Sequence, residues 1–264
     1  MTRQPISPTL SRIALFPIKA LDGVVVGEAM IRSGGGLSGD RELAIFDTAG
    51  RFVNGKREAR VHAVRASYDL AARIVSLQRE GSALAHFEMD RDRGRLEDWL
   101  SEHFGYRVHL RHNTQRGFPD DPVFFGPTVV CTETLSEVAS WFPGLDLEAV
   151  RRRFRTSLEF GGAEPFWEDR LVANGDPVMF HIGEVRLEGT VPWPRCVVPT
   201  RDADTGAATP MFQKSFTERR RATLPAWAPQ SQFDHFYRLC VGTRVPASEA
   251  GKVLRTGEPV TILA

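Results

Sequence analysis

The chain has 264 residues, of which 42% are hydrophobic and 25% charged, a composition typical of a globular protein with one large or two small domains. Its formal net charge of +1 argues against a nucleic-acid-binding protein that works by bulk electrostatics. Three cysteines are too few for a disulfide scaffold, and too few for the roughly four ligands of an iron–sulfur cluster.

The first ten residues, MTRQPISPTL, lack the apolar segment of a secretory leader. No apolar run approaches the roughly 18 residues that a membrane-spanning helix needs. The sparse, odd number of cysteines suits a reducing compartment. We therefore expect a soluble, cytoplasmic protein that binds neither membrane nor nucleic acid.

Short strand-like segments dominate the first ninety residues. The apolar runs cover residues 11–21, 24–33, 41–47, 51–55, 66–80 and 82–90. The turn Asp47–Gly50 joins two of these runs as a hairpin, and Glu80–Ser82 separates the last pair. SGGGLSGDR lacks the Lys-Ser/Thr ending of a P-loop and is interpreted as a flexible turn. Residues 94–104 carry apolar side chains at helical spacing and predict a helix.

A stretch rich in Pro, Gly and Asp, RGFPDDPVFFGP, marks the expected domain boundary. In TETLSEVASWF, Thr134 and Glu137 have the spacing of a capping box and predict the start of a helix. The remaining chain consists mainly of short strands separated by Gly/Pro turns. Many short strands with one or two helices in each half predict a mainly β, α+β protein with two barrel-like units.

Arginine makes up 30 of the 34 basic residues, and its planar fork suits phosphates and carboxylates. A gene rich in G and C would explain the same bias. The run RRRFR, residues 151–155, is typical of a solvated helix end, with the alternative that one arginine faces inward to hold an anion. No histidine or cysteine spacing of a zinc site is present, and DADTG, residues 202–206, is interpreted as a plain turn.

Cys196 lies in an unusual setting, PWPRCVVPT. Pro192, Pro194 and Pro199 fix φ and remove backbone donors, so the stretch is a rigid loop rather than a regular element. The adjacent Arg195 is a permanent cation, which should favour the thiolate that attacks electrophiles or binds metal. The other two cysteines lie in apolar runs and are interpreted as core residues.

Several motifs together resemble the molybdenum-cofactor sulfurase C-terminal (MOSC) domain and its N-terminal β-barrel partner domain. The matching segments lie in the family's order along nearly the whole chain: FPIKALDGVVVGEA, GLSGDRELAIFD, FVNGKREARVHAV, the FR of FRTS, FWEDRLVANGDPVMFHIGEVRLE, PRCVVPTRDADTG and VLRTGEPVTIL. The resemblance implies a β-barrel domain over residues 9–117 and a MOSC domain over residues 118–264. Relatives include the mitochondrial amidoxime-reducing component.

The resemblance also implies a binding site for the molybdenum cofactor, Mo-molybdopterin. Cys196 matches the loop cysteine that ligates molybdenum and would be the catalytic centre of the protein. The anionic part of the cofactor would contact Lys19, Arg41, Arg155, Ser157 and Arg195. Arginine forks and a lysine charge suit its phosphate, and a soft thiolate suits molybdenum.

The chain departs from the family pattern at four positions near this expected site. Pro194 replaces a serine that often precedes the Arg-Cys pair, and Ala20 replaces the serine after the lysine. In the family's FRPN element, Thr156 replaces proline and Ser157 replaces asparagine. Each of these changes except Thr156 removes or shortens a hydrogen-bonding group.

The implied activity is reduction of N-hydroxylated or N-oxygenated small molecules. Electrons would come from a separate protein, ferredoxin-like or flavin-reductase-like, because the chain has no flavin or cluster motif of its own. The alternative is a carrier that holds sulfur as a persulfide, or the cofactor itself, on Cys196 without turnover, with a cysteine desulfurase as partner. A family fold that has lost the cofactor is the third reading.

Overall fold

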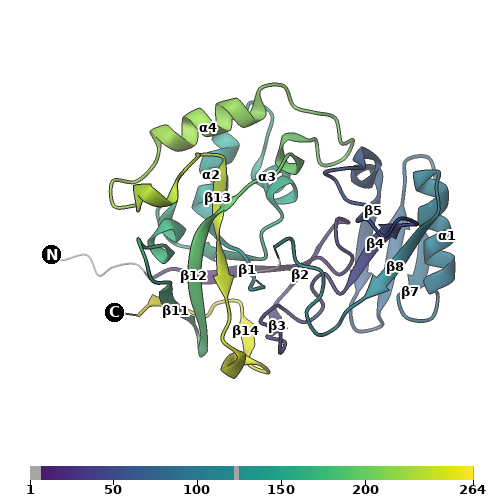
Figure 1. The fold of residues 1–264 in the computed structure, drawn as a ribbon, viewed down its shortest axis with the longest axis horizontal. Helices are drawn as coiled ribbons and strands as arrows, with labels where there is room; N and C mark the ends of the chain where they lie inside the picture. Colours follow the sequence, from purple (N-terminus) through teal and green to yellow (C-terminus); the bar gives the residue numbers. More distant parts are fainter. Residues whose placement is uncertain (1–6, 122–124, 264) are drawn as a thin grey trace.

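The computed structural model describes residues 7–121 and 125–263. This part of the chain forms the predicted mainly β, α+β fold (Figure 1). It has four α-helices, one in the first half and three in the second, where one or two were expected. The strands are β1 (Thr9–Leu15), β2 (Val24–Val26), β3 (Glu28–Met30), β4 (Leu43–Asp47), β5 (Arg65–Asp69), β6 (Ile74–Gln78), β7 (Ala85–Glu88), β8 (Val108–His112), β9 (Val129–Cys131), β10 (Leu158–Gly161), β11 (Val178–Ile182), β12 (Val185–Pro194), β13 (Arg238–Arg244), β14 (Val253–Arg255) and β15 (Val260–Ile262). The helices are α1 (Arg93–Phe104), α2 (Thr132–Ser140), α3 (Leu147–Phe154) and α4 (Phe212–Ala222), with short 3-10 helices η1 (Ala59–Ala63), η2 (Trp167–Leu171), η3 (Val198–Thr200), η4 (Gln230–Gln232) and η5 (Ala247–Glu249).

Eight strands form the largest sheet, in the order β15-β11-β12-β13-β9-β10-β1-β2. Backbone hydrogen bonds also join residues 8–10, at the start of β1, to residues 257–260, which lead into β15. These bonds bring the two sides of the sheet together and give it a barrel-like curvature. The sheet's inner face buries an apolar core drawn from both ends of the chain, including Leu10, Ile13, Phe160, Phe180 and Val241.

One strand pair of the large sheet is parallel, β9 with β10. A parallel pair needs a crossover connection, and here α2 and α3 provide it. These two helices and α4 share a second core that contains Phe154, Phe212 and Phe216. The crossover returns through residues 155–157, which directly precede β10.

Three smaller sheets, β14-β3, β4-β8 and β5-β6-β7, complete the fold. The last two pack with α1 at the right of Figure 1 around a core made only of residues between 18 and 110. The same region's first strands, β1 and β2, belong to the large sheet instead. The division at residues 117 and 118 therefore stays a prediction.

Two local predictions are confirmed and one is refined. Helix α1 follows the predicted spacing and buries Leu96, Leu100 and Phe104. The hairpin at Asp47–Gly50 forms, with Gly50 at a φ of 73°. The single apolar run at residues 66–80 is divided into β5 and β6 by a turn in which Arg73 has a φ of 55°.

The capping-box prediction is wrong. Helix α2 begins at Thr132, and Thr134 is a fully buried residue inside its first turn. The Thr134 hydroxyl accepts a hydrogen bond from the backbone of Phe166 at 2.6 Å and donates to Glu168 at 2.8 Å. From the sequence alone, a threonine whose hydroxyl bonds a later segment cannot be distinguished from a threonine that caps a helix.

In the described part of the chain, every helix is too short or too polar to cross a lipid bilayer.

Candidate functional site

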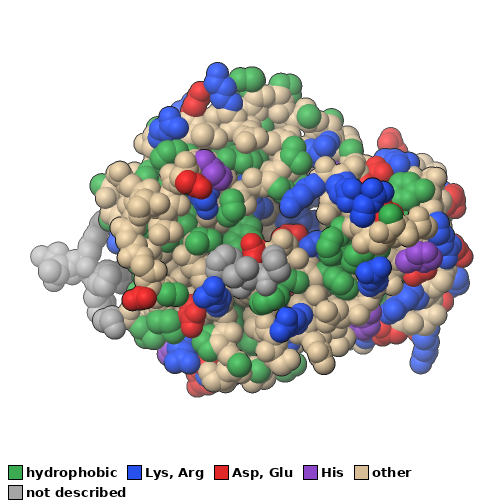
Figure 2. Space-filling model, in the orientation of Figure 1, with side chains coloured by type: hydrophobic (Ala, Val, Ile, Leu, Met, Phe, Trp, Pro, Cys, Tyr) green, Lys and Arg blue, Asp and Glu red, His purple; other side chains and the backbone are tan. Residues whose placement is uncertain are grey.

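A cavity of about 350 Å³ opens where loops from the two parts of the chain meet. Its walls come from residues 16–65 and from residues 116–203. Figure 2 shows it as a hollow with basic side chains around it. All the residues predicted for the site line this one cavity: Lys19, Arg41, Arg155, Ser157, Arg195 and Cys196.

Lys19 lies in the turn after β1 and is 7% exposed. Its ammonium donates to the carbonyls of Phe118 and Pro119, both at 2.9 Å, and pairs with Asp120 at 2.7 Å. Burial lowers the pKa of Lys19, although the Asp120 carboxylate opposes that shift. Despite partial burial, the charges of Lys19 and Arg41 hold the pKa of Asp120 well below its usual value. A carboxylate of this chain thus pairs with Lys19 inside the cavity.

Arg41 ends the turn-rich GLSGDR segment, with a φ of 51°. Its backbone donates to Phe16 at 2.9 Å and accepts from Phe118 at 2.8 Å, which fixes the turn against β1 and the Phe118 loop. Its guanidinium pairs with the carboxylate of Asp40, and the same carboxylate accepts from the backbone of Phe16. Although burial opposes it, the charge of Asp40 raises the pKa of Arg41.

Arg155 is the C-cap of α3, with a left-handed φ of 53°. This conformation turns its side chain out of the helix and into the cavity, where Nη2 donates to the carbonyl of Leu21 at 2.6 Å. The guanidinium also lies 4.2 Å from the ring centre of Phe16. Among the described residues, no carboxylate lies within ion-pair distance of Arg155. Burial and the nearby charge of Arg41 lower its pKa to about 10, so it stays protonated at neutral pH.

Ser157 follows Arg155 and is almost fully buried. Its backbone donates to the hydroxyl of Thr128 at 3.3 Å and accepts from Ala14 at 2.8 Å. Its own hydroxyl has no hydrogen-bond partner among the residues that the structure describes. A free hydroxyl in the cavity wall is a ready contact for a polar ligand.

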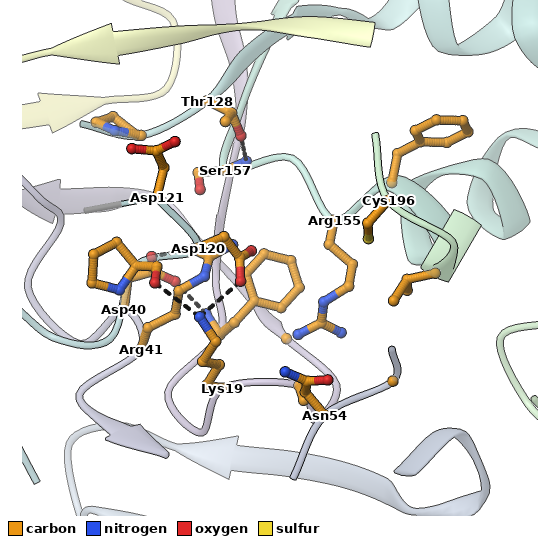
Figure 3. Close-up of a pocket in the computed structure, with 18 of the residues that line it drawn as sticks. Lys19, Asp40, Arg41, Asn54, Asp120, Asp121, Thr128, Arg155, Ser157 and Cys196 are labelled. Carbon is orange, nitrogen blue, oxygen red and sulfur yellow. Dashed lines mark hydrogen bonds and ion pairs between the residues drawn. The ribbon is translucent and has the colours of Figure 1, made fainter. Parts of the chain in front are cut away.

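Cys196 lies in the loop between β12 and η3 and is half-buried in the cavity wall. In the view of Figure 3, the guanidinium of Arg155 is drawn between Cys196 and the Lys19–Asp120 pair. The cavity therefore presents cations on one side and a thiol on the other. A ligand that reaches both sides would have an anionic group next to the cations and a centre that can bond the Cys196 sulfur.

Arg195 has a different orientation from the one that its sequence position suggests. Its guanidinium donates to the carbonyl of Phe154, the last residue of α3, and lies 3.5 Å from the sulfur of Cys240. It thus ties the cysteine loop to the end of α3. Arg153, only 5% exposed, holds the other side of the loop by donating to the carbonyl of Pro199 at 3.2 Å.

The DADTG segment forms a turn, as predicted. The carboxylate of Asp202 accepts from the backbones of Asp204 and Thr205, at 3.1 and 2.9 Å. Gly206 has a φ of 73°, and a Cβ there would lie 2.6 Å from the Ala59 carbonyl of η1, so only glycine fits this contact between the two parts of the chain.

Arg65, which the sequence did not single out, and Arg152, a member of the run RRRFR, both contact this turn. Arg65 of β5 donates to the Ala203 carbonyl at 3.1 Å and pairs with Asp204 at 2.9 Å. Arg152 of α3 contacts the same two groups at 3.2 and 2.6 Å. The sequence of the run RRRFR did not predict that Arg152 contacts the turn, because it did not show which of its arginines faces inward.

The four departures from the family pattern have distinct surroundings. Ala20 and Pro194 line the cavity without offering a side-chain hydrogen bond, and Ala20 adopts a φ of 80°. Thr156 lines a smaller cavity of about 200 Å³ instead, with its buried hydroxyl unpartnered. The serine replacement at position 157 leaves a hydroxyl in the main cavity.

The donor set of the cavity fits an anionic, sulfur-seeking group such as the molybdenum cofactor. Arg155 and the Ser157 hydroxyl are available to a phosphate without displacing a carboxylate of the protein. Lys19 and Arg41 would accept a phosphate in place of, or beside, their aspartate partners. Cys196 supplies a single soft ligand, as a centre that already carries other sulfur ligands requires.

Residues 7–116 match the family model described as the MOSC N-terminal beta barrel domain. No curated protein matches the sequence. A solved structure described as "Crystal structure of an hypothetical protein" aligns over 98% of this chain and 70% of its own length, with a TM-score of 0.41 and 11% sequence identity. A likeness at this level gives no information on function.

Proposed function

We propose that this chain, a MOSC-domain protein by virtue of its N-terminal β-barrel domain, binds the molybdenum cofactor in the cavity and reduces N-hydroxylated or N-oxygenated small molecules. MOSC domains are associated with molybdenum-cofactor binding in general. For a hydroxylamine, the reaction consumes two electrons and two protons, breaks the N–O bond, and releases the amine and water. A separate redox protein, ferredoxin-like or flavin-reductase-like, supplies the electrons.

The observation that carries the proposal is the meeting of six residues from four separate segments in one basic cavity. Three cations, a free hydroxyl and a half-buried thiol reach the same 350 Å³ space. Buried charge is costly without a partner, and Arg155 has no carboxylate within ion-pair distance among the described residues. Its guanidinium lies over the ring of Phe16 and donates a hydrogen bond to the carbonyl of Leu21.

Each residue has a role in this proposal. Cys196 would ligate the metal through its thiolate, while Arg155, Lys19 and Arg41 would hold the anionic part of the cofactor. The Ser157 hydroxyl would donate to the same part. Arg195 keeps the cysteine loop on the end of α3. When bound, the cofactor supplies the two-electron oxygen-transfer chemistry, which the side chains themselves do not provide.

A second candidate is a carrier that holds the cofactor, or a persulfide, on Cys196 for handover. One observation favours it: Asp120 and Asp40 already neutralise Lys19 and Arg41, so an anionic ligand must compete with carboxylates of the protein. Weak, exchangeable binding suits a carrier. A cysteine desulfurase would be its partner for the persulfide form.

The test is the molybdenum content of protein purified from a host that makes the cofactor. The parent, Cys196→Ala and Cys131→Ala are compared, since Cys131 is a buried thiol outside the cavity. We expect about one molybdenum per chain in the parent and in Cys131→Ala, and little in Cys196→Ala with an unchanged melting temperature. Protein without molybdenum in all three would refute cofactor binding.

Reduction is then measured with reduced methyl viologen as electron donor, so that the natural redox partner is not needed. Turnover of an N-hydroxylated substrate by the molybdenum-loaded parent supports the reductase. Loaded protein that reduces none of a panel of such substrates, but transfers its cofactor to a recipient apoenzyme, favours the carrier.

A further inference from the structure

The cavity concentrates positive charge. Ten Lys or Arg side chains and only four Asp side chains line it, whereas the net charge of the whole chain is +1. Figure 2 shows the basic side chains gathered around the hollow. A concave surface of one sign focuses its field and raises the local concentration of ions of the opposite sign.

Most of these cations have a partner within the protein. Five form ion pairs with aspartates: Lys19, Arg41, Arg65, Arg152 and Arg153. Three more donate hydrogen bonds to main-chain carbonyls: Arg32, Arg155 and Arg195. The two that remain are both exposed and belong to loops at the mouth of the cavity.

Lys56 is one of these two. Its turn is fixed by hydrogen bonds from the backbones of Lys56, Arg57 and Glu58 to Asn54. Its ammonium has no ion-pair partner in the described part of the chain, and its field acts on both Lys19 and Asp120. Because Lys56 lines the cavity and is exposed, its charge lies at the opening, where it also acts on the inner pair.

Arg116 is the other. Asn113 accepts hydrogen bonds from the backbones of Gln115, Arg116 and Gly117, which fixes this turn as well. The guanidinium lies 5.3 Å from the ring centre of Phe125, another residue of the cavity wall. No carboxylate among the described residues pairs with it. Two well-anchored loops thus hold unneutralised cations over one opening.

We propose that Lys56 and Arg116 select substrates that carry an anionic group, such as a carboxylate remote from the nitrogen that is reduced. This inference rests on the proposed function, because it names the substrate class of the same cavity. The inner cations already form ion pairs with aspartates or hydrogen bonds with carbonyls, and in the proposed function they also hold the cofactor. The outer pair is left to recognise a carboxylate entering from solvent, a contact that for exposed charges is weak and is screened by salt.

The test uses the molybdenum-loaded full chain and two substrates that differ only in charge: a benzamidoxime with a para-carboxylate and its para-carboxamide. We expect the parent to favour the acid in kcat/KM by about tenfold at low ionic strength, with a preference that falls as salt is added. Lys56→Met and Arg116→Gln should each reduce the preference about two- to fivefold, as exposed charge pairs do. Lys214→Met, an exposed change on α4 away from the cavity, is the matched control.

Two further measurements distinguish a failure of the substrate proposal from a failure of the proposed reductase function. Molybdenum content should be the same in parent and variants, and its loss in Lys56→Met or Arg116→Gln would assign these cations to the cofactor and overturn the substrate proposal. Binding of the two product amidines, with and without the carboxylate, is measured by calorimetry without turnover. If the carboxylate product binds more tightly but neither substrate is reduced, the reductase proposal is refuted and the anion selectivity is supported. If both substrates are reduced with equal kcat/KM, the anion selectivity is refuted and the reductase proposal is supported.

Discussion

Glu168 should make the protein less stable as the pH rises from 4.5 to about 7. Its side chain is 1% exposed, and it accepts hydrogen bonds from the hydroxyl of Thr134 at 2.8 Å and the backbone of Cys131 at 3.3 Å. The neighbouring Asp169 is also buried and forms the ion pair with Arg220. Burial, followed by the charge of Asp169, raises the pKa of Glu168 from 4.5 to about 7.

The sign and size follow from proton linkage. The folded protein binds this proton more tightly than the unfolded chain does, so the contribution to stability is complete below pH 4.5 and is lost as the pH rises through about 7. Since a tenfold change in proton affinity is worth about 1.4 kcal/mol, the full effect is about 3 kcal/mol, of which about 2 kcal/mol falls between pH 5 and 7.5.

Urea unfolding at pH 5 and at pH 7.5 measures this effect, with tryptophan fluorescence as the signal. The parent should lose about 2 kcal/mol more over that interval than Glu168→Gln, whose amide does not titrate. Glu164→Gln, the same change on an exposed side chain, should behave as the parent does. Parallel pH dependences in the parent and in Glu168→Gln would refute the argument.

Three further changes test individual contacts. Asp120→Asn removes the carboxylate that neutralises Lys19 and should tighten the binding of inorganic phosphate up to about fivefold in a calorimetric titration. Ala20→Gly relieves a residue with a φ of 80° and should raise the free energy of unfolding by about 0.5–1 kcal/mol. Arg153→Met leaves a buried carbonyl without its donor, so it should cost about 1–3 kcal/mol and speed the reaction of Cys196 with a thiol reagent.

Each of these has an outcome that contradicts it. Unchanged phosphate affinity in Asp120→Asn would mean that the aspartate does not compete with anions. A less stable Ala20→Gly would mean that the left-handed conformation costs less than the added freedom of the unfolded chain. Equal thiol reactivity in Arg153→Met and in the parent would mean that the arginine does not hold the loop.

The predictions that succeeded depended on local physics. Helix α1 follows from the spacing of its apolar residues, and the Asp47–Gly50 hairpin from its turn residues. Neighbours in sequence determine these features, so a single sequence contains the information for them. The prediction that the prolines around Cys196 exclude a regular element is wrong. Pro192 and Pro194 lie in β12, which pairs with β13 through an irregular register, and only residues 195–197 form a loop before η3.

The predictions that failed or were incomplete depended on long-range contacts. Thr134 looks like a helix cap until Glu168, from a later segment, is placed beside it. The contact of the Arg195 guanidinium with the Phe154 carbonyl, at the end of α3, was not indicated by the sequence. The meeting of Lys19 with Arg155 depends on β1 pairing with β10, and only the family resemblance indicated it.

The pairing of β1 with β10, and its bonds to residues 257–260, also affect the order in which the chain folds. The ribosome makes β1 early, yet two of its three partners lie about 150 and 250 residues later in the sequence. All residues of the core within residues 18–110 are synthesised much sooner, so this core can form while the rest of the chain is still being made. Until β10 emerges, β1 has only β2 to pair with and its other edge is open, which is where a nascent chain of this protein is most prone to aggregate.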